Sequence, residues 1–424
     1  MGHKAISVLS KIKGGKSHRV KRRLSRYILA VVIAALLLKM APSLYSVMII
    51  AIFVGALFGI NLYVEQINSK SFNISADAAL NKEKKHYNDH GERFKKDELG
   101  CWCVYSRPGN TYRILHLADI HIGNSFISFK KDQKALRAIE RVINHTQPDL
   151  VVVTGDMVYP VPLLSGSGNN LTATRLFANF MESFGIPWTV TFGNHDEEIF
   201  SWYPLESLCE VYEQSHNCLF QRGPDGVTGV SNHIINILNS DGTLNTSLFM
   251  LDSHDYINPF LFLHYDHIRE DQVEWYEQQI KSISSYYNNG KIVPSLAFFH
   301  IPLNEFNDAW ELWQNGGDPE VYYHYGEKVE KVSAPIKRSS IFEKMVELGS
   351  TRGVFVGHDH YNDFSITYRG IRLTYGKSID YLAYMKIAQS NWQRGGTLIE
   401  IDQSANMEIT PLSISKIDQE ENCK

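Results

Sequence analysis

The sequence predicts an α/β domain in which helices cover β-sheets, and two observations support this class. Between residues 112 and 196, short apolar runs alternate with amphipathic stretches, which is typical of strands joined by helices. After residue 230, several apolar runs come in pairs around a short turn, which indicates hairpins. The chain has 424 residues, of which 44% are apolar and 21% charged, so it is long enough for one large globular domain or two small ones.

The N-terminal part differs in composition from the rest. Residues 1–26 hold nine Lys or Arg and no acid, so we predict a basic arm there. Residues 27–63 are apolar with one charge, Lys39, and the part from 44 to 63 has the roughly 20 residues that a bilayer crossing needs. We therefore predict a membrane anchor over 27–63 with its main span at 44–63. A buried core helix or a cleaved signal peptide fits this length and position less well.

The charge of the arm predicts the orientation of the chain in the membrane. The positive-inside rule keeps the arm in the cytosol, so a single span puts the following domain in the extracellular or lumenal space. If residues 27–41 also cross the membrane and form a hairpin with 44–63, the domain lies on the cytosolic face instead. We favour the single pass, with the lipid bilayer as a partner. The net charge of −4 argues against binding by bulk electrostatics to nucleic acid, so no nucleic acid is expected.

The remaining chain divides into a polar linker over 64–111, a domain over 112–415 and a short tail over 416–424. In the first half of the domain, the apolar pattern predicts strands at 112–119, 148–156 and 187–196, with helices at 130–146 and 173–184 between them. In the second half, the same kind of pattern predicts two hairpins, one at 233–253 that turns at Asp241-Gly242 and one at 363–377 around Arg369-Gly370. It also predicts a helix at 268–284 and strands at 292–300 and 354–356.

Polar residues of metal-binding type stand where five of these strands end. They are Asp119, Asp156, Asn194, His300 and His358. In open α/β sheets, ligands bind outside the carboxyl ends of the strands, so we expect these side chains to lie together at that edge of the sheet. Two more histidines complete the motifs D-x-H (119–121) and H-x-H (358–360), in which a pleated strand would direct both side chains to one face. Carboxylate, imidazole and amide groups suit Mn, Fe or Zn, and this set is large enough for two metals that share one carboxylate.

These motifs carry a resemblance to a known family. The order D-x-H, G-D, G-N-H-D, H and G-H-x-H resembles the calcineurin-like metallophosphoesterase superfamily, over roughly residues 112–402. The sequences at 265–280, 298–306 and 354–364 are similar to those of the purple-acid-phosphatase-related branch of plants and fungi. The resemblance implies an α+β fold, a four-layer sandwich of two mixed β-sheets flanked by helices. It also implies a phosphoric ester hydrolase with a dinuclear metal centre.

The resemblance also implies a role for each residue of the motifs. Asp156 would bridge two divalent or trivalent ions (Mn, Fe or Zn). The ligands of metal 1 would be Asp119, His121 and His360, and those of metal 2 would be Asn194, His300 and His358. The catalytic pair would be His195, which resembles the group that protonates the leaving group, and Asp196, which could hold the other ring nitrogen of His195.

The chemistry expected from such a centre is phosphoryl transfer to water. Two metals about 3.5–4 Å apart can clamp a phosphoryl group and turn a bridging water into hydroxide, which attacks phosphorus in line. We expect a membrane-anchored phosphatase acting on phosphomonoesters in a small molecule, a protein or a lipid head group. One alternative is a phosphodiesterase acting on nucleotides or lipid head groups. Another is a catalytically inactive scaffold or binding protein that retains the fold.

Four further expectations concern residues near the motifs. The purple enzymes combine D-x-G with an iron-bound tyrosinate from G-D-x-x-Y, but this chain has both His121 and Tyr159. We expect His121 to fill the place of the tyrosinate and Tyr159 to pack without binding metal, so the protein would be colourless. His116 should be a core residue, and Asp359 should face away from the metals. The aromatic segment 302–338 forms either a lid at the site or an insertion that packs on its own domain.

Overall fold

A computed structural model describes residues 94–106, 111–258, 263–384 and 392–422, with a few isolated residues between 51 and 63. The predicted basic arm and nearly all of the predicted anchor and its span at 44–63 lie outside these residues. Among the residues that are described, no helix combines the length and the apolar character that a bilayer crossing requires. The chain divides into two units, 1–63 and 64–424, and both main sheets belong to the second unit.

One of the two main sheets has five strands in the order β16-β15-β3-β4-β5. Its three parallel strands, β3, β4 and β5, form the first half of the domain, and the chain returns at its end to add β15 antiparallel to β3. The strands are β3 (Tyr112–Leu117), β4 (Leu150–Thr154), β5 (Trp188–Thr191), β15 (Gly395–Ile401) and β16 (Met407–Ser413). The helices beside this sheet are α3 (Phe129–Thr146), α4 (Pro162–Ser165), α5 (Asn170–Glu182), α6 (Leu205–Gln214) and α10 (Ile414–Asn422).

The other main sheet has nine strands in the order β1-β2-β6-β7-β10-β12-β14-β13-β11, with parallel pairing at its centre. Its strands are β1 (Phe94–Lys96), β2 (Trp102–Tyr105), β6 (His233–Leu238), β7 (Leu244–Met250), β10 (Ser295–Phe298), β11 (Val321–Tyr325), β12 (Thr351–Val356), β13 (Ser365–Tyr368) and β14 (Ile371–Tyr375). The associated helices are α7 (Glu270–Asn288), α8 (Glu305–Gln314) and α9 (Ile341–Leu348). A separate hairpin consists of β8 (Tyr256–Asn258) and β9 (Leu263–Tyr265).

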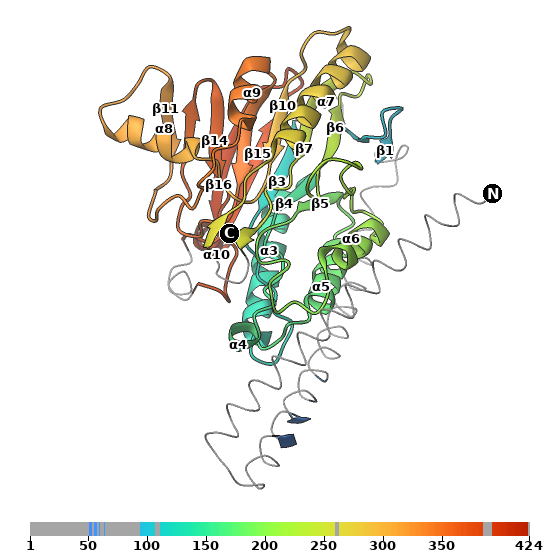
Figure 1. Ribbon diagram of the computed structural model, residues 1–424, viewed down its shortest axis with the longest axis vertical. Helices are drawn as coiled ribbons and strands as arrows, with labels where there is room; N and C mark the ends of the chain where they lie inside the picture. The colour runs from blue at the N-terminus through green and yellow to red at the C-terminus, as the bar shows by residue number, and fades with distance from the viewer. Residues whose placement is uncertain are drawn as a thin grey trace, which may run out of the picture. The chain divides into compact units, whose positions relative to one another are not determined.

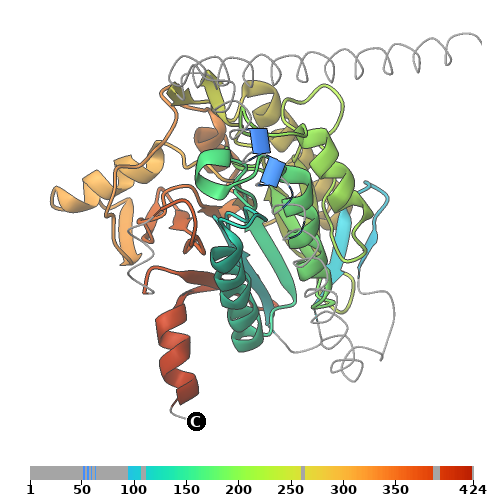
Figure 2. The same cartoon turned by 90° about the horizontal axis from the view of Figure 1, so that it is seen from below.

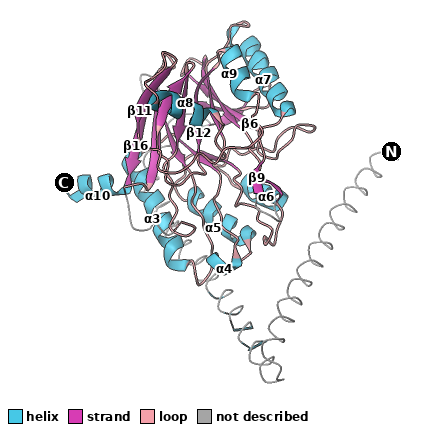
Figure 3. Ribbon diagram, turned by 60° about the vertical axis from the view of Figure 1, so that its left-hand side comes forward, coloured by secondary structure: helices cyan, strands magenta, loops and turns pink. Residues whose placement is uncertain are grey.

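The sheets and helices form layers (Figures 1 and 2), and three buried clusters lie between these layers. Between the sheets, Phe298 and Phe355 stack at 4.9 Å and pack with Ile114 and Ile399 of the opposite sheet. The outer face of the five-stranded sheet packs against α3 and α5, and that of the nine-stranded sheet against α7 and α9. Figure 3 shows α7 and α9 at one end of this unit and α4 and α5 at the other. The predicted arrangement of two mixed sheets flanked by helices is confirmed.

Both predicted hairpin turns are present, and the second shows why its sequence suits it. Arg369 and Gly370 have φ values of 49° and 82° between β13 and β14. Two central residues with positive φ characterise the turn that matches the right-handed twist of paired strands, and glycine adopts it without a steric cost. In the other hairpin, Gly242 has a φ of 86° and its N–H donates to the carbonyl of Asn239.

The domain boundaries differ from those predicted. Within the range predicted as a linker, β2 pairs in parallel with β6 and buries Cys103 and Val104, so the folded unit begins before residue 112. Only four residues form this strand, which is too short for a clear apolar period. The predicted tail at 416–424 contains most of α10, whose Ile417 is buried in the cluster that includes α3.

The aromatic segment 302–338 packs on its own domain, which is the second of the two alternatives considered for it. It forms α8 and β11, and β11 extends the edge of the nine-stranded sheet beside β13. Trp310 is buried against Phe364 with 4.7 Å between ring centroids, and Trp313 stacks on Tyr323 at 4.4 Å.

Candidate metal centre

All seven predicted metal ligands are buried and lie in the turns that follow the carboxyl ends of five strands. The five-stranded sheet supplies four of them, Asp119, His121, Asp156 and Asn194, after β3, β4 and β5. The nine-stranded sheet supplies His300 after β10, and His358 and His360 after β12. Direct contacts join the two groups, and in one of them the N–H of His358 donates to Oδ1 of Asp119 at 3.0 Å.

The backbone at these ligands is turned rather than pleated. Asp119, His121, Asp156 and His358 have φ values of 53°, 58°, 56° and 77°, a region that residues other than glycine seldom occupy. The prediction that a pleat directs the paired side chains is therefore wrong, because β3 ends at 117 and β12 at 356, before the motifs begin. Strained conformations of this kind cluster at functional sites, where the surrounding structure holds them.

Two glycines of the motifs let the chain approach the ligands closely. A Cβ atom on Gly193 would lie 2.3 Å from Oδ1 of Asp156. A Cβ atom on Gly357 would lie 2.8 Å from Cβ of Ala118 and 3.0 Å from Oδ2 of Asp119. The small residue before Asn194 and the one before His358 are thus required by packing around the carboxylates.

Around His300, four polar atoms converge as the ligands of one cation would. Its Nε2 lies 3.1 Å from Oδ1 of Asn194, 3.2 Å from Nδ1 of His358 and 3.2 Å from Oδ2 of Asp156. Because Nδ1 of His300 donates to the carbonyl of Thr154 at 2.8 Å, Nε2 is the atom that presents a lone pair once the ring gives up a proton and becomes neutral. A cation among these buried oxygen and nitrogen atoms would satisfy them all, so the residues fit the predicted metal 2.

A second cluster contains His121, His360 and Asp119, together with Asp380, a residue that we did not predict. The two imidazoles stack with centroids 4.9 Å apart, and the Nδ1 atom of each lies 3.3 Å from an oxygen of Asp380. The Nε2 atoms point the other way, 3.1 Å from Asp156 in His121 and 3.5 Å from Asp119 in His360. Asp380 thus fixes the orientation of both rings, as carboxylates behind metal-binding histidines do, and the set fits metal 1.

Asp156 lies between the two clusters, as a bridging ligand must. Its Oδ2 is 3.1 Å from Nε2 of His121 and 3.2 Å from Nε2 of His300. Burial lowers the pKa of each histidine, but the carboxylates more than offset this and raise the pKa of His121 to about 10 and that of His300 to about 9. The centre therefore attracts positive charge strongly.

The prediction that Asp196 holds the ring of His195 is wrong. Nδ1 of His195 lies 2.5 Å from Oε1 of Glu198, whereas the Asp196 carboxylate accepts hydrogen bonds from the backbone N–H groups of Gly193, Asp156 and Val158 at 2.8–3.1 Å. Asp196 thus fastens the turns after β4 and β5 to each other. Adjacency in the sequence does not predict which acid contacts His195, since consecutive residues of a turn point in different directions.

His116 lies in the core and Asp359 faces away from the clusters, as expected, and Tyr159 packs beside His121. The Tyr159 ring lies edge-on to His121 at 5.1 Å, and burial raises its pKa to about 12, which favours the neutral phenol. His116 bonds through Nε2 to the Thr154 hydroxyl at 2.7 Å, and burial lowers its pKa to about 3. The Asp359 carboxylate accepts from the Tyr375 hydroxyl at 2.6 Å and turns toward the segment before α9.

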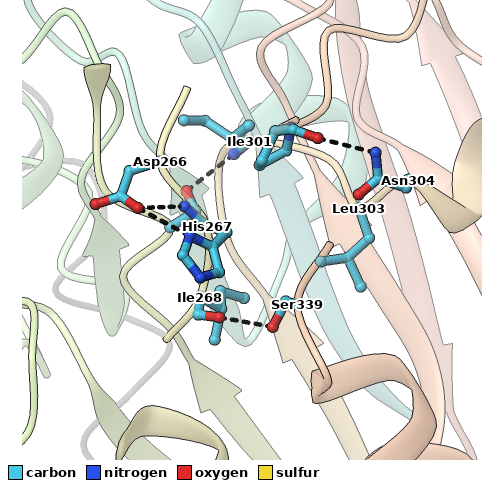
Figure 4. A pocket seen from close by; sticks show the side chains of 9 residues that line it. Asp266, His267, Ile268, Ile301, Leu303, Asn304 and Ser339 are labelled. Carbon is cyan, nitrogen blue, oxygen red and sulfur yellow. Dashed lines mark hydrogen bonds and ion pairs between the residues drawn. The ribbon is translucent and has the colours of Figure 1, made fainter. Parts of the chain in front are cut away.

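Two hollows lie beside the centre. The smaller, shown in Figure 4, has about 10 Å³ and is lined by residues that include Asp266, His267 and Ser339, so it holds no more than one water. The larger has about 480 Å³ and is open to solvent. It is lined in part by Tyr256, whose hydroxyl accepts a hydrogen bond from the Asn194 amide at 2.9 Å. Of these two hollows, the larger has room for an organic group.

Comparison with known proteins places this geometry in a family. The model of the calcineurin-like phosphoesterases matches residues 112–362. The chain is 30% identical to the probable inactive purple acid phosphatase 29 of Arabidopsis thaliana, over 72% of this chain and 83% of that protein. It is 28% identical to the probable inactive purple acid phosphatase 28 of the same plant, over 69% of this chain and 76% of that protein. It is 30% identical to the phosphatase DCR2 of Saccharomyces cerevisiae, over 60% of this chain and 45% of that protein. The predicted resemblance is confirmed, and the chain belongs to the calcineurin-like phosphoesterase family.

Proposed function

We propose that this chain is a dinuclear metal-dependent phosphatase that hydrolyses phosphomonoesters. The observation that carries the proposal is the position of Asp156 between two clusters of buried side chains of metal-binding type, with Oδ2 3.1 Å from Nε2 of His121 and 3.2 Å from Nε2 of His300. A scaffold that had lost its chemistry would have no use for this convergence of buried polar atoms, which destabilise the fold unless they are satisfied.

The residues of the chain have distinct tasks in this proposal. Bound metals would neutralise the phosphoryl oxygens and activate a water. His195, half-buried beside the clusters and held by Glu198, donates a proton to the leaving oxygen. Tyr256 orients the Asn194 amide so that its oxygen faces His300. The hollow next to Tyr256 accommodates the organic part of the substrate.

The test compares p-nitrophenyl phosphate with bis-p-nitrophenyl phosphate in the presence of Mn²⁺. We expect faster turnover of the monoester, whereas faster turnover of the diester would favour the phosphodiesterase. Asp156→Asn should abolish activity with the fold retained, because it removes the shared charge from both clusters. His195→Ala should reduce turnover while both metals stay bound. Full activity in either variant would overturn the mechanism.

Both plant relatives named above carry the word "inactive" in their names, so the inactive scaffold must be tested directly. Metal analysis of the protein purified without chelators distinguishes the two. About two metals per chain support the enzyme, and fewer than about one supports the scaffold.

The membrane anchor with its main span at 44–63 remains part of the proposal, supported by the composition of that segment. Protease protection of the domain in sealed vesicles tests the predicted non-cytosolic side. Cleavage of the domain from the cytosolic side would instead favour the hairpin.

A further inference from the structure

Exposed apolar side chains gather in the three turns that also carry metal-centre residues. We call Ile127, Leu163, Leu164, Phe200 and Trp202 the apolar rim. Leu163 is 92% exposed, Leu164 52% and Ile127 45%, so these side chains contribute little to the core. Each residue of the rim follows one of His121, Asp156 and His195 by no more than eight positions, after β3, β4 or β5. The rim and the metal centre therefore belong to the same edge of the five-stranded sheet.

Close contacts hold the three turns together as one surface. The Ser125 hydroxyl donates to the carbonyl of Ser165, and a Cβ atom on Gly166 would lie 3.0 Å from Cβ of Ile127. The N–H of Trp202 donates to the carbonyl of Gly168 at 2.8 Å. The rim is therefore a fixed platform, with the single-turn helix α4 (Pro162–Ser165) at one end of the described domain (Figure 3).

Basic residues lie beside this platform at the start of α3. Lys130 and Lys134 are exposed and one helical turn apart, so they share a face, and Lys131 is half-exposed. The beginning of a helix favours acids, so these lysines do not serve the stability of α3. The acid of this turn, Asp132, is buried and accepts from the N–H groups of Gly123 and Asn124, so it is not available at the surface.

We infer that the apolar rim docks on a membrane surface that carries anionic lipids. Exposed leucine, isoleucine and tryptophan side chains flanked by lysines are the combination that enters the boundary between head groups and acyl chains. Lysines near such a surface add electrostatic attraction, so charge complementarity selects the anionic bilayer over a neutral partner. Docking would turn the metal centre toward phosphorylated head groups, a consequence that rests on the proposed function.

Lipid quenching of a fluorescent probe tests this inference in the full chain. The described cysteines are buried, so Cys423→Ser leaves a background in which Leu163→Cys can be labelled selectively with bimane. The control is Ile292→Cys, because Ile292 is exposed but precedes the amino end of β10. The protein is reconstituted with phosphatidylcholine vesicles containing about 30% phosphatidylserine and spin-labelled lipid.

We expect the probe at 163 to be quenched at least about twofold more than the probe at 292. The difference should shrink when phosphatidylserine is omitted or when Lys130 and Lys134 are changed to Glu. Equal quenching at both positions would overturn the inference. So would shielding of the probe at 163 without lipid together with a doubled mass in light scattering, since a second copy would then cover the rim. Turnover of p-nitrophenyl phosphate is measured separately, so failure of the proposed function is distinguishable from failure of docking.

Discussion

Glu198 holds the ring of His195 through a 2.5 Å contact between Oε1 and Nδ1. The glutamate itself is almost fully buried and is fixed by Ser201, whose hydroxyl accepts from the Glu198 N–H at 2.8 Å. A buried carboxylate against one ring nitrogen leaves the other nitrogen to face the substrate, and it stabilises the charged ring that is needed for proton donation.

Glu198→Gln should therefore lower turnover by about 10- to 100-fold without loss of metal, because the charge that supports the protonated ring is removed. Steady-state kinetics and metal analysis measure the two quantities. Glu197→Gln is the matched control, since the Glu197 carboxylate accepts from the N–H of Leu205 instead. Equal effects of the two substitutions would contradict the assignment.

Asp380→Asn should weaken metal binding at the cluster of His121 and His360 by about 10- to 100-fold, because the rings lose the carboxylate that orients them. Competition with a chromophoric chelator measures the affinity. Asp225→Asn, at an exposed position, serves as control. Unchanged affinity in Asp380→Asn would show that packing alone holds the rings.

Metal affinity should rise with pH up to about 9. The metal-free protein keeps His121 and His300 protonated over this range, since their pKa values are raised to about 10 and about 9, and a metal must displace those protons. Calorimetric titration with Mn²⁺ at pH 8 in two buffers of different ionisation enthalpy gives the number of protons released. We expect one to two, and none would contradict the arrangement of charges.

The metal-loaded protein should show no visible absorption band from tyrosinate. The rings of Tyr159 and His121 pack in a T-shaped arrangement at 5.1 Å, and burial raises the pKa of Tyr159 to about 12, which favours the neutral phenol over tyrosinate. Absorption spectra of the native protein and of Tyr159→Phe should coincide above about 400 nm, the range in which a charge-transfer band would lie. A band that disappears in the variant would identify Tyr159 as a ligand.

Acid should destabilise the fold partly through His233. Burial lowers the pKa of His233 to about 4, whereas an unfolded histidine titrates near 6.5. Between these values only the unfolded state takes up the proton, so the free energy of unfolding falls as pH decreases, by up to about 1.4 kcal/mol per pH unit. Urea unfolding at pH 7 and pH 5 should show a smaller difference for His233→Gln than for the control His216→Gln, at an exposed position.

The strand-end pattern predicted that Asp119, Asp156, Asn194 and His300 lie close together, and they do, because each stands within three residues of the end of a buried strand. It could not find Asp380. That residue reaches the centre because the chain after β14 folds back along the end of β3, where Ser378 bridges to Ala118, and no spacing in the sequence specifies this return. Glu198 was missed for a related reason, since the turn after β5 decides which acid faces His195. The strand β2 was missed because its partner, β6, lies about 130 residues later.

The division of the ligands between two sheets affects when the metal can be acquired during synthesis. The first four ligands are made by residue 194, but His358 and His360 come near the end of the chain, and Asp380 later still. The sheet that carries the first four also needs β15, from residue 395, beside β3. A nascent chain released early from the ribosome would thus lack both the ligand set and the strand that supports it. On the proposed metal assignment, the complete ligand set therefore becomes available only when nearly the whole chain has been made.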